Sequence, residues 1–315
     1  MSRVSLTRAG ATLAALLLVA AFCERNAAAQ AWVDPAGSLS ASFDYSYSPS
    51  SAIVTNPDVP KSEGEPITAH MFQLGAEYTP IEDLAVDATM PIIAVKYGGD
   101  GDPFPRHGSY DDGSLHTTLT DLRLNVRYQL LHDIVAFTPR IGASIPVTDY
   151  EHVGFANAGR GLKQLHLGAS VGRTLDPVLP NLFAQATYEY SLVEHFTDTM
   201  TEEEADVTKT VGQNRSDIAA LIGYFFLDGD LRVDLGFNWR IQHGGVGFLT
   251  LGDPGQPMYD YHDPLLDEEF MLLGGDVGYD VTDRLSVQAT TRFFLRGYNT
   301  RDANIFGLGL TFAIL

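Results

Sequence analysis

Apolar and polar residues alternate along most of the chain. Between positions 231 and 242, the odd positions carry Leu, Val, Leu, Phe, Trp and Ile, whereas the even positions carry Arg, Asp, Gly, Asn, Arg and Gln. The same period of two marks residues 39–47, 122–130 and 135–147. Successive side chains of a β-strand point to opposite sides, so this pattern predicts strands with one apolar and one polar face.

Twelve segments carry this alternation, and they are long for strands. Each has about 11 to 15 residues, whereas strands of soluble proteins average about 5–6. A tilted strand that crosses a bilayer needs about 9–11 residues, so the lengths favour membrane-spanning strands. The expected strands are residues 38–48, 68–79, 84–97, 116–130, 135–148, 161–174, 182–194, 214–226, 231–243, 269–280, 285–297 and 303–315.

The connections between these segments alternate between long and short. The long ones are residues 49–67, 98–115, 149–160, 195–213 and 244–268, and the short ones are 80–83, 131–134, 175–181, 227–230 and 281–284. All the long connections therefore fall at one end of the strands, where only the last connection, 298–302, is short. Long external loops opposite tight periplasmic turns are typical of outer-membrane barrels.

We therefore predict an all-β, transmembrane antiparallel up-and-down β-barrel of about 12 strands, with long external loops and short periplasmic turns. The barrel must close, because an unpaired sheet edge in lipid would leave backbone groups without hydrogen bonds. A secreted soluble β-protein would have core positions as apolar as these, but its loops would not sort by length. An aromatic girdle is expected beside the short turns, from Tyr78, Tyr128, Phe137, Tyr224 and Tyr279.

The N-terminal residues have the pattern of a secretory signal peptide. Arg3 and Arg8 precede an apolar run from about residue 11 to 22, and small residues follow at 27–31. We expect residues 1–30 to be cleaved and residues 31–315 to form a single outer-membrane domain. The one cysteine, Cys23, lies in this leader, so thiol chemistry is not expected of the mature chain.

Charge narrows the range of partners. The chain has 20 basic and 40 acidic side chains, and a net charge of −20 argues against nucleic acid, because phosphate binding relies on Lys and Arg. The five long connections hold 19 acidic and 4 basic residues, which we interpret as a solvated acidic rim. Binding of divalent cations or of a surface partner by these carboxylates is the alternative. Outer-membrane lipid and lipopolysaccharide are the expected surroundings, and the oligomeric state stays open.

The polar faces of the predicted strands carry as many bases as acids. The eight bases are Arg123, Arg127, Arg140, Arg215, Arg232, Arg240, Arg292 and Arg296. The eight acids are Asp44, Glu77, Asp87, Asp121, Glu189, Asp217, Asp234 and Asp276. From these we select ten candidate pore-lining residues: Arg123, Arg127, Arg140, Asp217, Arg232, Asp234, Arg240, Asp276, Arg292 and Arg296.

One cross-strand pair can be predicted directly. Asp228-Gly229 is a hairpin-turn signal, and a turn centred there sets Asp217 opposite Arg240. Such pairs suit an open polar eyelet whose transverse field orients solutes. They suit a lumen closed by salt bridges equally well, because twelve strands lie between the filled eight-strand and the wide sixteen-strand barrels.

Catalytic, metal and cofactor sites are not expected. Residues 168–172 match G-x-S-x-G, but Ser170 falls within a strand, whereas the mechanism needs a sharp strand-to-helix turn. A barrel lipid hydrolase would need a reactive Ser170 beside a histidine, and no convincing pair is found. The nine histidines lack metal-binding spacing, and His166 is expected to form a hydrogen bond in the lumen. We therefore expect no enzyme activity.

The middle of the chain resembles a known family. The stretches concerned are residues 120–124 (TDLRL), 139–150 (PRIGASIPVTDY), 159–162 (GRGL) and 165–168 (LHLG). They resemble the bacterial outer-membrane transporter family assigned to the meta-pathway of phenol degradation, over about residues 115–175. The resemblance implies an outer-membrane channel for aromatic or other small hydrophobic solutes, and it supplies no catalytic residues.

The expected function is passive passage of small solutes through an outer-membrane β-barrel channel, with aromatic or hydrophobic compounds as candidate solutes. The alternative is a structural or surface-interaction barrel whose lumen is closed by salt bridges. An autotransporter barrel is disfavoured, because no passenger precedes the first predicted strand.

Overall fold

The computed structural model describes residues 31–56, 58, 62–98, 110–150, 152–202, 205–250 and 265–315. Within these ranges the regular structure is almost entirely β, and no helix is long and apolar enough to cross a membrane. The strands are β1 (Leu39–Val54), β2 (Ser62–Ile81), β3 (Leu84–Tyr97), β4 (Leu115–Leu119), β5 (Asp121–Tyr128), β6 (Ala136–Pro146), β7 (Gln164–Thr174), β8 (Leu182–Val193), β9 (Phe196–Glu202), β10 (Ala205–Val211), β11 (Asn214–Phe226), β12 (Leu231–His243), β13 (Glu269–Thr282), β14 (Leu285–Tyr298), β15 (Thr300–Arg301) and β16 (Ile305–Ala313). The expected signal peptide lies outside the described residues.

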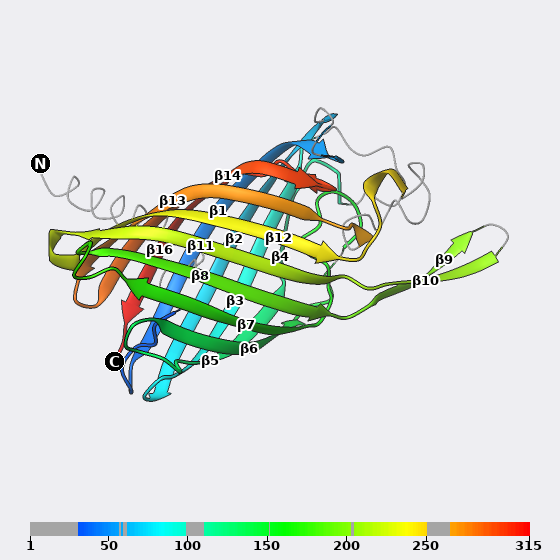
Figure 1. Ribbon diagram of the computed structural model, residues 1–315. Coiled ribbons are helices and arrows are strands. Elements are labelled where there is room, and N and C mark those ends of the chain that lie inside the picture. The colour runs from blue at the N-terminus through cyan, green and yellow to red at the C-terminus, as the bar shows by residue number, and fades with distance from the viewer. Residues whose placement is uncertain are drawn as a thin grey trace, which may run out of the picture.

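The strands form one closed antiparallel barrel (Figure 1). β1 pairs with β2 on one side and with β16 on the other, so the barrel has no free edge. β4 and β5 both pair with β3 and are separated only by Thr120, so together they make one barrel strand. With the short β15 and the β9–β10 hairpin set aside, the barrel has 12 strands, which confirms the predicted fold class.

The turn between β11 and β12 has the predicted geometry. Asp228 and Gly229 have positive φ angles of 58° and 110°, as the two central residues of a tight hairpin turn require. The N–H of Asp230 donates to the carbonyl of Leu227 at 3.2 Å. The strands leave this turn in the expected register.

The opposite end of the barrel carries the long connections, and some of their residues continue as strand. β1 continues to Val54 and β2 begins at Ser62, so both strands are longer at this end than predicted. The connection after β8 contains the β9–β10 hairpin, which projects from the barrel (Figure 1). Backbone pairing continues there outside the bilayer. In water both faces of a strand can be polar, so the alternation that predicts strands is lost although the hydrogen-bond ladder persists.

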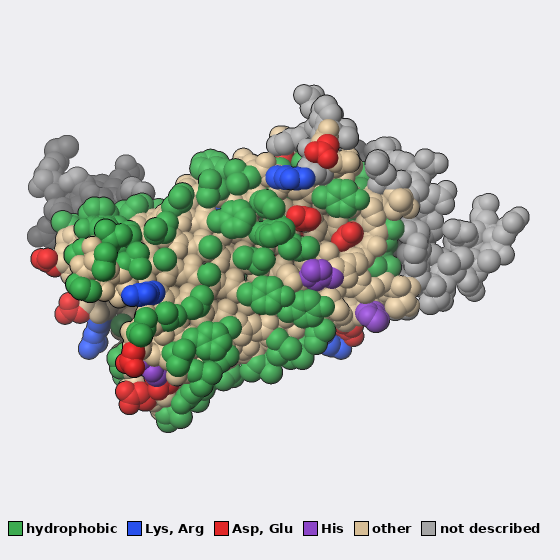
Figure 2. All heavy atoms as spheres, viewed as in Figure 1, with side chains coloured by type: hydrophobic (Ala, Val, Ile, Leu, Met, Phe, Trp, Pro, Cys, Tyr) green, Lys and Arg blue, Asp and Glu red, His purple; other side chains and the backbone are tan. Residues whose placement is uncertain are grey.

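The outer face of the barrel is apolar (Figure 2). In β5, Leu124 and Val126 are 43% and 41% exposed, whereas Asn125 and Arg127 between and beside them are 9% and 4% exposed. Apolar side chains outside and polar side chains inside suit a barrel in lipid, and this fold places the protein in the bacterial outer membrane. The girdle tyrosines are exposed beside the short turns: Tyr78, Tyr128, Tyr224 and Tyr279.

The prediction that Arg296 faces the lumen is wrong. Leu272 pairs with Phe294 but Met271 pairs with Arg296, so Leu295 is an extra residue in β14. This β-bulge shifts the alternation by one position. Arg296 is therefore exposed on the same outer face as Met271.

A charge placed on the lipid-facing surface should weaken the barrel. Leu235 of β12 is 54% exposed on this face, so Leu235→Arg is expected to lower the free energy of unfolding by about 2–4 kcal/mol in lipid. Urea titration of the refolded protein in liposomes measures this, with Leu235→Ala as the control that removes apolar surface without adding charge. Equal stabilities of the two variants would contradict the assignment of this face to lipid.

Candidate functional site

A cavity of about 710 Å³ lies in the middle and periplasmic parts of the lumen. Seven of the ten predicted pore-lining residues line it: Arg123, Arg127, Arg140, Asp217, Arg232, Arg240 and Arg292. Asp234 and Asp276 lie deeper in the wall, 4% and 1% exposed. Arg232 and Arg292 cover them, with ion pairs of 3.0 and 2.6 Å. The charged belt formed by these nine residues is the candidate functional site.

Glu189 of β8 also lines the cavity, and it is the centre of an ion-pair cluster with two arginines of this belt. Nη2 of Arg123 lies 2.6 and 2.8 Å from its two carboxylate oxygens, and Nη2 of Arg140 lies 3.0 Å from the carboxylate. Nδ1 of His166 lies 3.4 Å from Oε1 of Glu189. Two arginines against one carboxylate give this part of the wall a formal excess of positive charge.

Asp217 of β11 is the centre of a second cluster, in which two arginines again face one carboxylate. Nε of Arg240 lies 2.7 Å from Asp217, which confirms the predicted cross-strand pair. Nε of Arg215 lies 3.2 Å from the same carboxylate. The wall from β5 through β12 therefore carries two clusters with more arginines than acids.

The wall formed by β1, β2 and β3 has the opposite balance. Arg127 reaches it from β5 and lies 2.7 Å from Glu77 and 3.8 Å from Asp87. Asp44 of β1 adds a third carboxylate to the cavity lining and is 3% exposed. β2 lies about half the barrel circumference from β8 and β11 in the strand order, so acidic and basic excesses face each other across the lumen.

Glycines on the intervening strands let these long side chains reach their partners. Gly168 lies between Arg140 and Glu189 in one cross-strand row, and a Cβ there would meet the carbonyl oxygen of Tyr188 at 2.5 Å and Nε of Arg140 at 3.1 Å. Gly278 likewise separates Arg232 from Gln288, which are joined by a hydrogen bond of 3.2 Å. A Cβ at Gly168 would therefore crowd the arginine, whereas one at Gly278 would make an ordinary contact of 3.6 Å with Nη2 of Arg232.

The residues before β1 fold back into the periplasmic mouth. The N–H of Ala31 donates to Gln185 at 3.1 Å, its carbonyl accepts from Thr138 at 2.6 Å, and the N–H of Val33 donates to Gln129 at 2.8 Å. Trp32 lines the lumen cavity. Residues 31–33 therefore narrow this end of the path.

The loop between β6 and β7 folds into the outer mouth. The carboxylate of Asp111 accepts hydrogen bonds from the N–H groups of Phe155 (2.9 Å) and Ala156 (2.7 Å), and Ala156 packs on the inner wall of β2 and β3. The hydroxyl of Tyr150 donates to Asp121 at 2.7 Å. Burial, reinforced by this carboxylate, raises the pKa of Tyr150 and keeps it a neutral donor.

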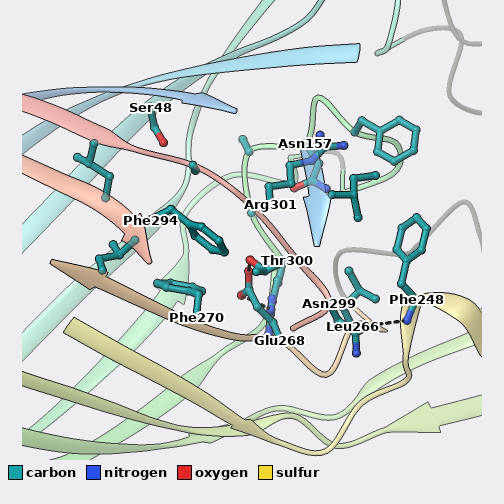
Figure 3. A pocket seen from close by; sticks show the side chains of 18 residues that line it. Ser48, Asn157, Phe248, Leu266, Glu268, Phe270, Phe294, Asn299, Thr300 and Arg301 are labelled. Carbon is teal, nitrogen blue, oxygen red and sulfur yellow. Dashed lines mark hydrogen bonds and ion pairs between the residues drawn. The ribbon is translucent and has the colours of Figure 1, made fainter. Parts of the chain in front are cut away.

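A second cavity of about 410 Å³ lies at this outer end, between the inward-folded loops and the barrel wall (Figure 3). Its walls include four phenylalanines: Phe155, Phe248, Phe270 and Phe294. It shares Phe270, Leu272 and Ile305 with the larger cavity below it. The two cavities are therefore neighbours along the barrel axis, with an apolar outer compartment above the charged belt.

The motifs with catalytic appearance have ordinary hydrogen-bond partners. Ser170 is 1% exposed and shares a hydrogen bond of 2.9 Å with Thr187. His166 is fully buried and bonds Ser144 at 2.7 Å and Ser191 at 2.9 Å. In the described part of the chain, no group of three or more His, Cys, Asp or Glu residues could hold a metal ion.

Two parts of this site could not be recognised from the strand pattern. One is the periplasmic segment at residues 31–33, and the other is the loop with Phe155 and Arg160, which line the outer cavity. Both lie outside the alternating stretches. A weak signal exists for the loop, because Arg160 stands between two glycines, and Gly161 has a positive φ of 64°. Such a Gly-Arg-Gly sequence permits a sharp inward bend, but it does not identify the partners of the arginine.

Filling the space at Gly168 should displace Arg140 from Glu189. Gly168→Val is expected to lower the free energy of unfolding by about 1–3 kcal/mol, the usual cost of overpacking. Ala169→Val is the matched control, because position 169 lies on the opposite face of the same strand. Thermal unfolding of both variants in detergent measures the difference, and equal melting temperatures would contradict the packing described.

Removal of the N-terminal segment should widen the periplasmic mouth. A refolded chain that begins at Pro35 lacks Ala31, Trp32 and Val33 but keeps the hydrogen bond of 2.7 Å from Gly37 to Thr79. We expect a larger single-channel conductance from this chain than from one that begins at Ala31. Identical conductances would mean that these residues do not limit the path.

Comparison with known proteins gives structural matches only. No family model and no curated protein matches the chain. An outer-membrane channel from Pseudomonas putida F1 is similar in structure, with a TM-score of 0.65 and 14% identity over 90% of this chain and 97% of that chain. The translocator domain of the Neisseria meningitidis autotransporter NalP matches with a TM-score of 0.51 and 10% identity over 99% of both chains. The chain therefore has the fold of an outer-membrane β-barrel.

Proposed function

We propose that the barrel is a passive channel for small solutes across the outer membrane. The observation that carries the proposal is the cavity of about 710 Å³ between a wall with excess acid and a wall with excess base. Fixed ion pairs hold the side chains against the wall, so the bore between them is left to water and solute. No energy source is needed, because solutes would follow their own gradient.

Aromatic or other small hydrophobic compounds are the proposed solutes. The outer cavity supports this, because phenylalanines from two strands and two loops form its walls. The resemblance of residues 115–175 to the transporter family of the meta-pathway of phenol degradation points the same way. In this proposal the solute enters from a surface bounded by lipopolysaccharide, leaves the outer cavity past Phe270 and Leu272, and crosses the charged belt.

A closed structural barrel is the second candidate. The ion pairs that cross between strands, together with residues 31–33 in the periplasmic mouth, favour it. In that case the acidic external loops would bind a surface partner, and the charged belt would serve only to hold the barrel together.

Single-channel recording in planar bilayers separates the two candidates. The channel is expected to give discrete conductance steps, with increased cation selectivity in Arg240→Ala and increased anion selectivity in Asp217→Ala. These shifts should be larger at 0.1 M than at 1 M salt, because the screening length falls from about 10 Å to about 3 Å. Arg296→Ala is the matched control, since Arg296 lies on the outer face.

The outcomes are distinct. A folded wild-type barrel without conductance steps would overturn the channel proposal and favour the closed barrel. Steps whose selectivity does not differ among the three variants would show that the charged belt does not control passage.

A further inference from the structure

Two carboxyl groups lie directly opposite each other in the wall of the charged belt. Asp234 of β12 and Asp276 of β13 are partners in the strand register, so their Cβ atoms are about 4.5–5.5 Å apart. Both side chains are buried, and their carboxyl groups are in hydrogen-bonding contact. Like charges directly opposite each other destabilise a sheet, so two ionised carboxylates would strain this part of the wall.

The two carboxyl groups have unequal partners. Asp276 accepts hydrogen bonds from Nη1 (3.1 Å) and Nη2 (2.6 Å) of Arg292 and from the hydroxyl of Thr290 (2.6 Å). Neither oxygen of Asp234 accepts a hydrogen bond from the described residues, because Nε of Arg232 lies 3.0 Å away without the geometry of a hydrogen bond. The wall therefore supplies hydrogen-bond donors to one carboxylate of the pair.

A proton on Asp234 would complete this arrangement. An ionised carboxylate can only accept hydrogen bonds, whereas a protonated carboxyl group also has an O–H donor. The O–H of Asp234 would donate to Asp276, which Arg292 holds in its ionised form. The pair would then carry one negative charge in place of two, and the contact between the carboxyl groups would become a hydrogen bond.

An aromatic ring beside Asp234 also disfavours a second negative charge. A Cβ placed at Gly223 of β11 would lie 2.5 Å from Cζ of Phe183 and 2.8 Å from Cβ of Asp234. Both residues are register partners of Gly223, so the ring of Phe183 meets Asp234 over this glycine. The ring takes the place of water there, and a charge without water or a hydrogen-bond donor is costly.

The charged groups that face the pair come from β12, β14 and β1. Arg232 and Arg292 belong to the first two of these strands and contact the carboxyl groups. Asp44 of β1 lies in the same cross-strand row as Arg232, and the residues between them in this row are Gly278, Gln288 and Gly309. From β8, β11 and β16 the neighbours in the rows of the pair are uncharged: Phe183, Gly223 and Gly307.

We infer that Asp234 and Asp276 form a proton-binding site, which holds one proton between them at neutral pH and releases it to the lumen at alkaline pH. The two acids and the two arginines beside them have a formal charge of +1 with this proton and of zero without it. Arg232 and Arg292 line the cavity, so the change in charge reaches the path. Its effect on ion passage rests on the proposed function, whereas the proton-binding site does not.

Infrared spectroscopy of the folded barrel in detergent tests the inference, because the C=O stretch of a protonated carboxyl group is separate from the stretches of a carboxylate. At neutral pH the wild type should show the band of one carboxyl group that Asp234→Asn and Asp276→Asn both lose, since neither variant keeps the pair. The wild type should lose the same band at alkaline pH. A shift of the band in deuterated water verifies that it belongs to a carboxyl group.

Asp217→Asn is the matched control. It makes the same substitution in a carboxylate that two arginines hold, so this variant should keep the band in full. The slower migration of heated than of unheated samples in gels verifies that every variant is folded.

The charge of the path is measured separately in planar bilayers. The reversal potential of the wild type should shift toward cation selectivity as the pH rises from neutral to alkaline, because the wall loses one positive charge. The shift should be smaller in Asp234→Asn, in which Asp276, Arg232 and Arg292 keep a formal charge of +1 at both pH values.

The outcomes separate this inference from the proposed function. Absence of the band from the wild type at neutral pH, or its persistence in Asp234→Asn, would overturn the inference even in a conducting channel. Loss of the band in both variants of a barrel that gives no conductance steps would support the inference and overturn the channel proposal. Equal shifts of the reversal potential in Asp234→Asn and the wild type would overturn the effect of this proton on ion passage.

Discussion

The rest of the structure depends on one constraint, the hydrogen bonding of the backbone in lipid. Every N–H and C=O group within the bilayer must find a partner in the protein, so a sheet in this environment has to close on itself. Pairing of β1 with both β2 and β16 meets this requirement. Closure then divides the side chains of each strand between lipid and lumen, and the alternation of the sequence follows from that division.

Closure also confines the polar side chains to a wall of low dielectric, where an unpaired charge is costly. The lumen meets this cost through ion pairs between strands, as in the pairs of Glu189 with Arg123 and Arg140. Such pairs need space for the arginine side chain over the strands that separate the partners. Gly168 provides this space between Arg140 and Glu189, so this glycine is as necessary to the ion pair as the arginine.

The strand pattern predicted those parts of the molecule in which the position of a residue along a strand determines whether its side chain faces lipid or lumen. The 12 strands and the contact of Asp217 with Arg240 follow from period two and one turn signal. Arg296 was assigned to the wrong face, because a single extra residue at Leu295 reverses the alternation. The three consecutive apolar residues 293–295 mark an interruption of the period there, but they do not identify which of them is the extra residue. The inward course of Phe155 could not be predicted either, since it depends on the hydrogen bond that its N–H donates to the carboxylate of Asp111, a residue distant in sequence.

In the proposed function, the two compartments of the lumen set opposite demands on a solute. The outer cavity rewards apolar contact with Phe270 and Phe294, whereas the belt below it offers charged groups and water. A wholly apolar solute would gain in the first compartment and lose that gain in the second, and a small ion would do the reverse. A solute with an apolar body and one charged end would keep a favourable contact in both compartments. Because Phe270 lines both cavities, such a solute would still touch Phe270 while it moves from one cavity to the other. In this proposal, the side chains that select such a solute therefore also line an unbroken route from the outer cavity to the charged belt.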